Sequence, residues 1–321
     1  MAGVCCQCGG SGGLGMCGRC KQVGYCSRAC QTSHWADHKW VCSARVGIRA
    51  SGVGAGLGVF ALRAFDPGDE LVEERPALKC GSALHQVAEA WARAAGAVQG
   101  RVVMGMTDAW CARDGGKPTL EGILATNSIP AGESEAGIFA IACRINHACN
   151  PNARWLWRHD LGMELVIALR PIRAGEEVTV CYAGDLAFCG SEERRAHLAE
   201  HLRFDCACTL CAAQSAESDA RLCTIRDLQR KILRVHRAEP ALALELCHQV
   251  LDILEAEGRR IPMYTREVHH NMGRIALKLG LRDEAERYAA LALHDTRLTD
   301  GRGSPNAAAL EDEIQRFYVV A

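Results

Sequence analysis

The order of apolar and polar residues predicts strands in the middle of the chain. The two kinds alternate over residues 59–72, apart from a turn at 66–68 where aspartate, proline and glycine follow one another. Short apolar runs at 155–157 and 165–169 predict two more strands, and residues 177–182 predict another after a proline–glycine turn. These runs together indicate a β-rich region.

Apolar residues recur at helical spacing in two other parts of the chain. One is residues 83–95, and the other begins near residue 217, with no β-rich run before 318–320. Glycine and alanine recur over residues 272–289 at positions where two helices would cross. This resembles a tetratricopeptide helix hairpin, in which small residues let two helices pack closely. A plain helical bundle stays open as the alternative, because one unit cannot establish a repeat.

Composition indicates an ordinary globular protein of two or three domains. Of 321 residues, 49% are hydrophobic and 23% are charged, and the formal net charge is −1. There is no run of about 18 apolar residues, so we expect no membrane-spanning helix. The first ten residues lack a charged start and an apolar core, so we expect no secretory signal. The near-zero net charge gives no reason to expect a nucleic-acid partner.

Nineteen cysteines are the outlier in this composition. A disulfide framework is one interpretation, but many cysteines form Cys-x-x-Cys pairs with histidines nearby, which is typical of metal sites in a reducing compartment. Zinc binds four thiolates or imidazoles in a tetrahedron, so eight candidate ligands near the N-terminus would hold two ions. These ligands are Cys5, Cys8, Cys17, Cys20, Cys26, Cys30, His38 and Cys42. Few large apolar side chains surround them, so the metals would supply the folding free energy.

The later part of this segment resembles the MYND zinc finger. The residues that carry the resemblance are Tyr25, Cys26, Cys30, Trp35, His38 and Cys42. It implies an interleaved arrangement, with one ion on Cys5, Cys8, Cys26 and Cys30 and the other on Cys17, Cys20, His38 and Cys42. It also implies a protein-interaction module, often for proline-containing peptides. Cys6 is an alternative ligand to Cys5, and His34, off the motif, is expected on the surface.

Three later segments resemble the SET methyltransferase domain and come in its order. They are residues 56–61 with a Gly-x-Gly turn, residues 144–152 with an Asn-His pair, and residues 174–182 ending at a tyrosine. A glycine turn lets the backbone approach a ligand closely, although a turn without any ligand fits this segment equally well on its own. Asn-Pro turn chemistry explains Asn150 and Pro151, but it does not explain the neighbouring Asn-His pair.

A second cysteine cluster follows the SET segments. Cys206, Cys208 and Cys211 supply three ligands, one fewer than a closed zinc site needs. The resemblance implies that Cys149, beside the Asn-His pair, is the fourth. One ion would then tie the cofactor segment to the C-terminal flap, and the chain would hold three zinc ions in all.

The same resemblance implies that S-adenosylmethionine is the cofactor. Its expected contacts are Gly56, Leu57, Gly58, Asn127, Asn146, His147, Tyr182 and Phe204. Tyr182 is also expected at the methyl-transfer centre, where a neutral lysine amine attacks the methyl of a sulfonium in line. A plain core tyrosine at a strand end is the alternative interpretation of Tyr182.

The chain departs from the family pattern in four ways. The finger precedes the SET domain and does not lie inside it. Ala55 and Leu57 stand where basic and polar residues usually flank the glycine turn. The family's second active-site tyrosine falls at Leu202, which removes an aromatic wall from the lysine channel. Residues 73–137 are family-variable, so substrate contacts there cannot be named.

The expected fold class is therefore α+β. A MYND finger (1–46) precedes a β-rich SET domain (47–204) with a helical insert at about 73–137. The C-terminal segment of the SET domain is expected to thread beside residues 146–149 in a pseudoknot-like crossing. A post-SET zinc segment (205–214) follows, and an all-α tetratricopeptide-like domain (215–321) forms one wall of the substrate cleft.

The expected function is methylation of a lysine in a histone or non-histone protein. We expect a monomer in the cytosol or the nucleus, because sorting signals are absent and the thiols are reduced. An adaptor without turnover is the alternative, motivated by Ala55, Leu57 and Leu202. A zinc-finger transcription factor is disfavoured because it needs a basic face.

Overall fold

The structure is a computed structural model. It describes residues 5–11, 13–18, 23–39, 42, 45–52, 56–81, 106–109, 111, 116–213, 215–301 and 303–319. Three sequence predictions lie outside these residues: the helix at 83–95, the ligand Cys20 and the departure at Ala55. Among the described helices, none is both long and apolar enough to cross a membrane.

The N-terminal finger is a short hairpin followed by one helix. Strands β1 (Gly15–Met16) and β2 (Gly24–Tyr25) pair antiparallel, and α1 (Arg28–His38) follows. Ser27 caps this helix by accepting a hydrogen bond from the backbone nitrogen of Cys30. The small core consists of Cys5, Cys17, Tyr25 and Cys42, so the finger has little apolar packing apart from its cysteines.

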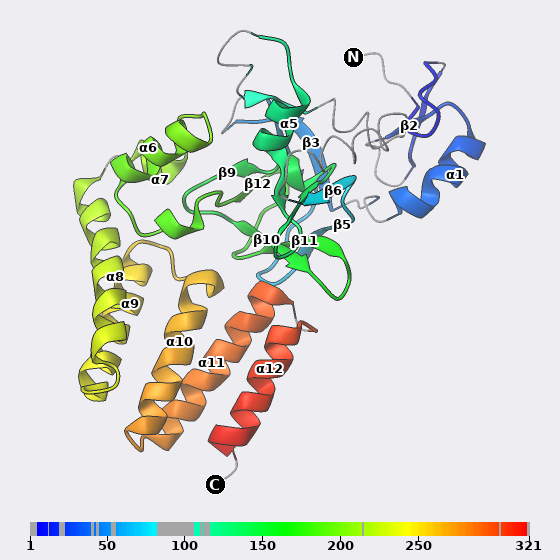
Figure 1. Ribbon diagram of the computed structural model, residues 1–321. Helices are drawn as coiled ribbons and strands as arrows, with labels where there is room; N and C mark the ends of the chain where they lie inside the picture. Colours follow the sequence, from blue (N-terminus) through cyan, green and yellow to red (C-terminus); the bar gives the residue numbers. More distant parts are fainter. Residues whose placement is uncertain are drawn as a thin grey trace.

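In the middle of the chain, the described residues form three small sheets (Figure 1). The first contains β3 (Val46–Ala50), β4 (Leu57–Ala61), β12 (Glu177–Val180) and β9 (Asn146–His147). The second contains β10 (Ala153–Arg158), β11 (Met163–Ala168) and β5 (Glu70–Glu74). The third contains β6 (Leu78–Gly81), β8 (Glu135–Ile138) and β7 (Ile129–Pro130), and α5 (Leu120–Asn127) precedes it in the chain. The predicted β-rich region is confirmed.

One strand pair in this region joins distant segments in parallel. Thr179 of β12 pairs with Asn146 of β9, and Val180 pairs with His147. The pair lies where the sequence predicts the crossing. It brings the Asn-His segment beside the strand that ends just before Tyr182, so the fold itself assembles the candidate site.

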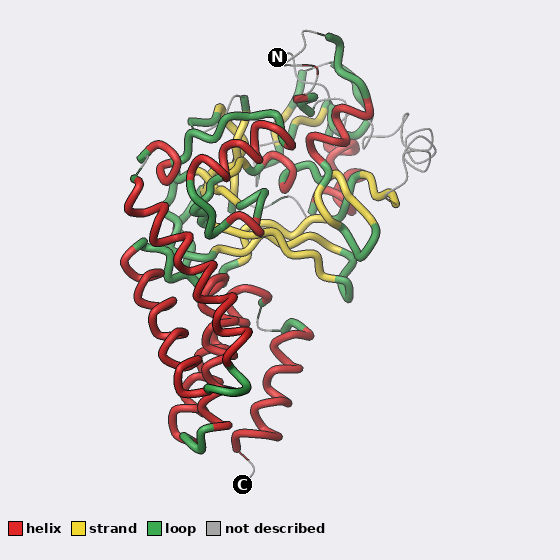
Figure 2. The backbone as a smooth tube through the Cα atoms, turned by 60° about the vertical axis from the view of Figure 1, so that its left-hand side comes forward, coloured by secondary structure: helices red, strands yellow, loops and turns green. Residues whose placement is uncertain are grey.

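The end of the chain is helical, as predicted. After α6 (Ser191–His201) and α7 (Thr209–Ala212) come α8 (Ala216–Val235), α9 (Pro240–Ala256), α10 (Pro262–Lys278), α11 (Arg282–Asp300) and α12 (Pro305–Ile314). Figure 2 shows the long helices gathered below the strands. The apolar run at 318–320 gives no strand at Tyr318, because Gln315–Val319 is a π-helical turn that continues α12.

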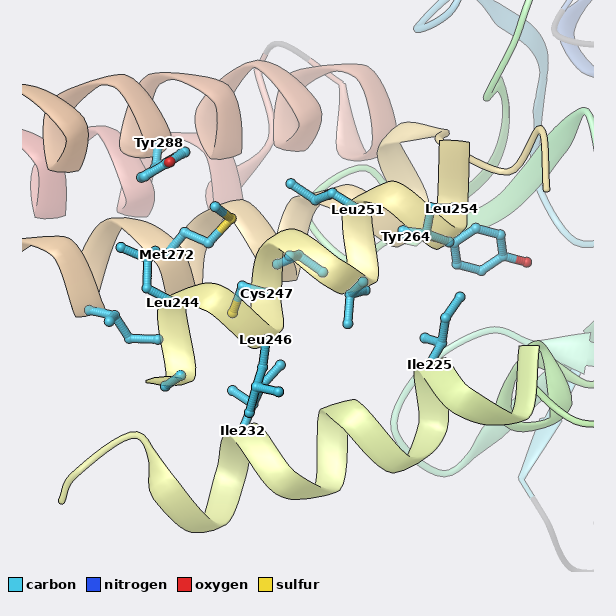
Figure 3. Packing of buried hydrophobic residues seen from close by; sticks show 14 of the residues in the cluster. Ile225, Ile232, Leu244, Leu246, Cys247, Leu251, Leu254, Tyr264, Met272 and Tyr288 are labelled. Atoms are coloured by element: carbon cyan, nitrogen blue, oxygen red, sulfur yellow. The ribbon is translucent and has the colours of Figure 1, made fainter. Parts of the chain in front are cut away.

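Apolar side chains of α9 hold this helical domain together (Figure 3). Leu246 of α9 points towards Ile232 of α8, and the core continues to Met272 of α10. Where α10 and α11 cross, a Cβ added at Gly273 would lie 3.4 Å from the backbone nitrogen of Ala289. The small residues noticed in the sequence therefore allow a close helix crossing.

Candidate active site

Four cysteines from two distant segments converge next to the Asn-His strand. Their sulfur atoms all lie within 4.8 Å of one another, and all four side chains are buried. They are Cys149, Cys206, Cys208 and Cys211. The sulfur of Cys149 lies 3.9 Å from that of Cys206 and 3.5 Å from that of Cys211. A tetrahedral zinc ion with bonds of about 2.3 Å needs sulfurs about 3.8 Å apart, so the donor set fits zinc.

Two buried arginines attach this post-SET cluster to the surrounding helices. Arg194 of α6 donates to the backbone oxygen of Cys189 and, at 3.9 Å, to the sulfur of Cys211. Arg259, fully buried before α10, donates to the backbone oxygens of Cys149 at 3.0 Å and Ala187 at 2.7 Å. A buried guanidinium is stable only when it is paired or hydrogen-bonded, so both arginines fix the position of the cluster.

His147 connects the cluster to the candidate catalytic tyrosine. Its Nδ1 accepts a hydrogen bond from the backbone nitrogen of Tyr182 at 3.0 Å, and its Nε2 lies 3.2 Å from the sulfur of Cys149. Because Nδ1 is the acceptor, the ring proton lies on Nε2, which then donates to the sulfur. Burial lowers the pKa of His147 to about 4, so the ring is neutral near pH 7.

Tyr182 is half-buried between three aromatic rings. The ring of Trp155 stacks on it at 5.3 Å with an interplanar angle of 11°. His147 lies 5.3 Å from it and Phe204 6.1 Å, measured between ring centroids. The Tyr182 hydroxyl donates to the backbone oxygen of Ile145 at 2.6 Å. Burial raises the pKa of Tyr182, so the phenol stays protonated at neutral pH.

Trp155 is a site residue that sequence reasoning missed. It sits on β10, and its indole Nε1 donates to the backbone oxygen of Ala142 at 3.3 Å, which fixes the ring beside Tyr182. Leu202, at the position of the missing tyrosine, packs against the cysteine cluster. The apolar run at 155–157 signalled a strand, but such a run alone cannot say which neighbour a ring will stack on.

The glycine turn and the Asn-His segment meet at a glutamate. Asn146 Nδ2 donates to the backbone oxygen of Leu57 at 3.1 Å and to Glu177 Oε1 at 2.8 Å. Ser51 and the backbone nitrogen of Gly52 also donate to Glu177, at 2.8 and 3.2 Å. A Cβ added at Gly58 would overlap Glu177 Oε1 and lie 2.9 Å from Asn146 Nδ2. Glycine is therefore required at Gly58 for this close approach.

Glu177 is the second residue that sequence reasoning missed, because a glutamate at the start of a strand looks like an ordinary solvent-facing residue. Gly56 has a φ of +105°, a backbone conformation that favours glycine.

Asn127 is placed differently from the other expected cofactor contacts. Its Nδ2 donates to the backbone oxygens of Thr107 at 2.7 Å and Ile123 at 2.6 Å. Within the described part of the chain, no hydrogen bond of Asn127 reaches Asn146 or Tyr182.

The finger carries two further groups of ligand atoms. The first is Cys5, Cys8, Cys26 and Cys30, and the second is Cys17, His38 and Cys42. In the second group, the sulfurs of Cys17 and Cys42 lie 3.5 Å apart, and His38 Nε2 lies 3.3 Å from Cys17. The grouping matches the interleaved pattern, with Cys20 outside the described residues. The expectation for His34 was wrong, because it is buried and its Nδ1 lies 2.9 Å from the Tyr25 hydroxyl.

Comparisons with known proteins agree with this geometry. A MYND finger model matches residues 5–42, and a SET domain model matches residues 56–183. The chain is 35% identical over 108 residues to the histone-lysine N-methyltransferase set5 of Schizosaccharomyces pombe, which covers 34% of this chain and 32% of that protein. It is 30% identical over 181 residues to the histone-lysine N-methyltransferase SMYD3 of Mus musculus, which covers 52% of this chain and 40% of that protein.

A third relative has a name that specifies protein lysine and not histone lysine. The chain is 32% identical over 79 residues to the protein-lysine N-methyltransferase SMYD4 of Homo sapiens, which covers 25% of this chain and 10% of that protein. The chain thus spans less than half the length of each of these relatives. The predicted resemblance to the SET and MYND family is confirmed, and so is the predicted order, with the finger before the SET domain.

Proposed function

We propose that this chain, which carries a MYND finger followed by a SET domain, is a protein lysine methyltransferase that uses S-adenosylmethionine. The observation that carries the proposal is the connection from Cys149 through His147 to Tyr182. Two segments far apart in sequence supply this connection, and a third segment, residues 206–211, completes the cysteine cluster that fixes one end of it. The names of the relatives support the same reaction.

The cofactor-binding role falls on the junction between the glycine turn and the Asn-His strand. S-adenosylmethionine, when bound, supplies an electrophilic methyl group on a sulfonium. The carboxylate of Glu177 and the side-chain oxygen of Asn146 suit the cationic amino end of such a molecule. The backbone around Gly58 leaves room for it, and Phe204 offers a ring surface near Tyr182. Leu57, Gly56 and Asn127 are further proposed contacts.

Tyr182 would position the reacting groups through its oxygen. Its hydroxyl hydrogen is committed to Ile145, so towards other groups the oxygen acts as an acceptor. An acceptor there can contact the polarised methyl hydrogens and hold the lysine amine in line. The lysine must arrive neutral, and a partly desolvated site beside a cationic cofactor lowers the pKa of an amine. No carboxylate base is needed for that step.

The same proposal includes three zinc ions, with Cys20 completing the second ligand group of the finger. It also includes the division into a finger (1–46), a SET domain (47–204), a post-SET segment (205–214) and a helical domain (215–321). The finger would bind proline-containing peptides, and the substrate would be a histone or another protein. A monomer in the cytosol or nucleus completes the proposal.

The test compares the full chain with its Tyr182→Phe variant. Each is incubated with radiolabelled S-adenosylmethionine and a peptide array of lysine-containing sequences. We expect label on lysine from the wild type, a loss of about 100-fold in the variant, and a cofactor Kd by calorimetry within about threefold for both. Cofactor binding without any label on lysine would support the adaptor and overturn the proposal.

A further inference from the structure

Glu74, the last residue of β5, holds its carboxylate against the turn at residues 140–142 and is only 2% exposed. Its Oε1 accepts hydrogen bonds from the backbone nitrogens of Ala140 at 2.5 Å and Ile141 at 3.2 Å. Its Oε2 accepts from the backbone nitrogens of Ile141 at 3.0 Å and Ala142 at 3.1 Å. Both oxygens are in use, so the carboxylate fixes the backbone that supplies these three amides.

The same turn supplies two backbone oxygens that hold rings of the candidate active site. The oxygen of Ala142 accepts the indole Nε1 of Trp155 at 3.3 Å, and the oxygen of Ile145 accepts the Tyr182 hydroxyl at 2.6 Å. A 3-10 turn, η1 (Ala142–Arg144), joins the two, and the backbone nitrogen of Ile145 donates to the oxygen of Ala142 at 3.3 Å. A shift of this turn would therefore move both stacked rings.

We propose that Glu74 is a positioning residue for methyl transfer, because its carboxylate holds the turn whose oxygens orient Trp155 and Tyr182. The inference rests on the proposed function. Within the described residues, the hydrogen bonds of Glu74 reach the backbone of this turn and neither of the two rings. A carboxylate that only stabilises the core would, when replaced, change the melting temperature and leave the rings where they are.

Glu164 of β11 provides a matched control. It pairs with Glu74 across the strands and is 1% exposed, but its Oε2 has no hydrogen-bond partner among the described residues. In Glu164→Gln, the amide nitrogen can take the place of Oε2 without facing another donor. In Glu74→Gln, the amide nitrogen faces a backbone N–H in either orientation, because both oxygens of Glu74 are in use. The same substitution therefore disturbs the turn at one position and spares it at the other.

The first measurement is the indole N–H resonance of Trp155 in ¹H–¹⁵N spectra of the full chain, assigned with Trp155→Phe. A longer hydrogen bond to Ala142 moves the indole proton upfield. We expect an upfield shift in Glu74→Gln that is at least about three times any shift in Glu164→Gln. Neither cofactor nor lysine substrate is present, so this measurement does not depend on the proposed methyl transfer.

The second measurement separates kcat from KM for a lysine peptide that the wild type methylates. In Glu74→Gln we expect kcat to fall by about tenfold, because the rings at the methyl-transfer centre are misplaced. The KM for the peptide should stay within about twofold and the Kd for S-adenosylmethionine within about threefold, since every proposed cofactor contact is kept. Glu164→Gln should keep both kinetic constants within about twofold of the wild type.

A pH titration of the wild type tests the same contact without a substitution. Burial raises the pKa of Glu74 to about 7, and the charged or titratable groups that act on it are Arg144, Cys143 and Glu164. Burial raises the pKa of Cys143 to about 12 and that of Glu164 to about 8, so Glu164→Gln removes the one competing titration among them. A proton on Glu74 must face a backbone N–H. The Trp155 proton should therefore move upfield as the pH falls through about 7, in the wild type and in Glu164→Gln alike.

Three results would overturn the proposal. They are an unmoved Trp155 proton in Glu74→Gln, an equal movement in Glu164→Gln, and an unchanged kcat in Glu74→Gln although the Trp155 proton has moved. If Glu74→Gln does not fold, the titration decides: a Trp155 proton that stays fixed through pH 7 overturns the proposal, and movement in both proteins supports it. A wild type that methylates nothing would refute the proposed function, and the Trp155 proton would still show whether Glu74 holds the rings.

Discussion

The finger and the post-SET cluster use the same ligand chemistry for different ends. The finger takes its ligands from residues 5–42, and two of them, Cys8 and Cys26, are exposed. The post-SET cluster takes its ligands from residues 149 and 206–211, and all four are buried. A cluster built within one short segment stabilises that segment, whereas a cluster that joins distant segments assembles the part of the molecule they share.

The neighbours of the two clusters extend the difference. Beside the post-SET cluster, His147 joins Cys149 to Tyr182, and Arg259 joins Cys149 to the helical domain. In the finger, the ring contacts of His38 are with Tyr25, His34 and Trp35, all of the same segment. Damage to the post-SET cluster should therefore reach the candidate active site, and damage to the finger should stay local.

The largest expected effect comes from breaking one cluster at a time. Cys208→Ser should release one equivalent of zinc and reduce methyl transfer to about 1% of the wild type or less, because it shifts the segment that orients His147 and Tyr182. Cys26→Ser should also release zinc but leave transfer within about twofold. The measurements are zinc content by mass spectrometry, thermal unfolding, and lysine labelling.

The zinc measurement makes this comparison decisive whichever way activity goes. If Cys208→Ser keeps a full zinc content, the four cysteines do not hold an ion. If Cys26→Ser loses transfer as fully as Cys208→Ser, the finger is coupled to the active site and the contrast between the two clusters is wrong.

A smaller effect should follow from closing the cofactor junction while leaving every cluster intact. Gly58→Ala places a Cβ against Glu177 and Asn146, so we expect the Kd for S-adenosylmethionine to rise by about tenfold. Gly52→Ala is the matched control, because an added Cβ there meets nothing within 4 Å and its backbone nitrogen can still donate to Glu177. Both variants should keep the wild-type zinc content.

Equal cofactor affinity in the two glycine variants would count against a binding site at this junction. If Gly58→Ala loses zinc in addition to cofactor affinity, the junction and the post-SET cluster fold as one unit. Calorimetry and metal analysis on the same preparations separate the two cases.

A still smaller loss of methyl transfer is expected when Trp155, the ring stacked on Tyr182, is replaced. Trp155→Ala removes that wall, so kcat/KM for the lysine substrate should fall by about five- to tenfold, the range of a lost aromatic pair. A wider channel should also raise the share of multiply methylated product in mass spectra. Trp155→Phe keeps a ring and should restore transfer to within about twofold of the wild type. An unchanged product distribution in Trp155→Ala would show that Trp155 does not border the lysine.

Much of the candidate site could be predicted, because the spacing of metal ligands and the order of the motifs restrict which residues can meet. The spacing of Cys206, Cys208 and Cys211 left one ligand missing, and the structure brings Cys149 to that place. Asn146, His147 and Tyr182 also meet, as the order of the segments indicated. Their roles as ligands and cofactor contacts remain predictions.

The rest depends on three-dimensional neighbours that no local pattern encodes. A short apolar run placed Trp155 on a strand, but the stacking partner follows from how β10 lies against the segment after β12. In the sequence, Glu177 looks like a surface residue; only the structure shows that Gly58 and Asn146 lie against its carboxylate. His34 lies off the ligand motif, yet its burial follows from the Tyr25 ring on the facing hairpin.

The last prediction concerns the stability of the SET core and a buried acid that lies outside the cysteine clusters. Glu164 on β11 pairs across strands with Glu74 of β5, and its Oε2 has no hydrogen-bond partner among the described residues. Burial raises the pKa of Glu164 to about 8 and that of Glu74 to about 7, from an ordinary 4.5. The backbone nitrogens of residues 140–142 donate to Glu74 and oppose its shift.

The sign of the pH dependence follows from these shifts. Below pH 4.5, Glu164 is protonated in both the folded and the unfolded chain. Between about 4.5 and 8 the unfolded chain ionises first, so the folded state loses stability as the pH rises, by on the order of 5 kcal/mol. Thiolate ligands behave in the opposite way, because protons compete with zinc and metal binding strengthens with rising pH.

Glu164→Gln isolates the acid from the metals, because both proteins keep every cysteine. We expect equal melting temperatures for variant and wild type at pH 5 and a higher melting temperature for the variant at pH 8, where glutamine removes the cost of a buried charge. Glu217→Gln, at a side chain that is 89% exposed, should follow the wild type at both pH values. If the difference between Glu164→Gln and the wild type is the same at pH 5 and pH 8, Glu164 does not titrate in this window.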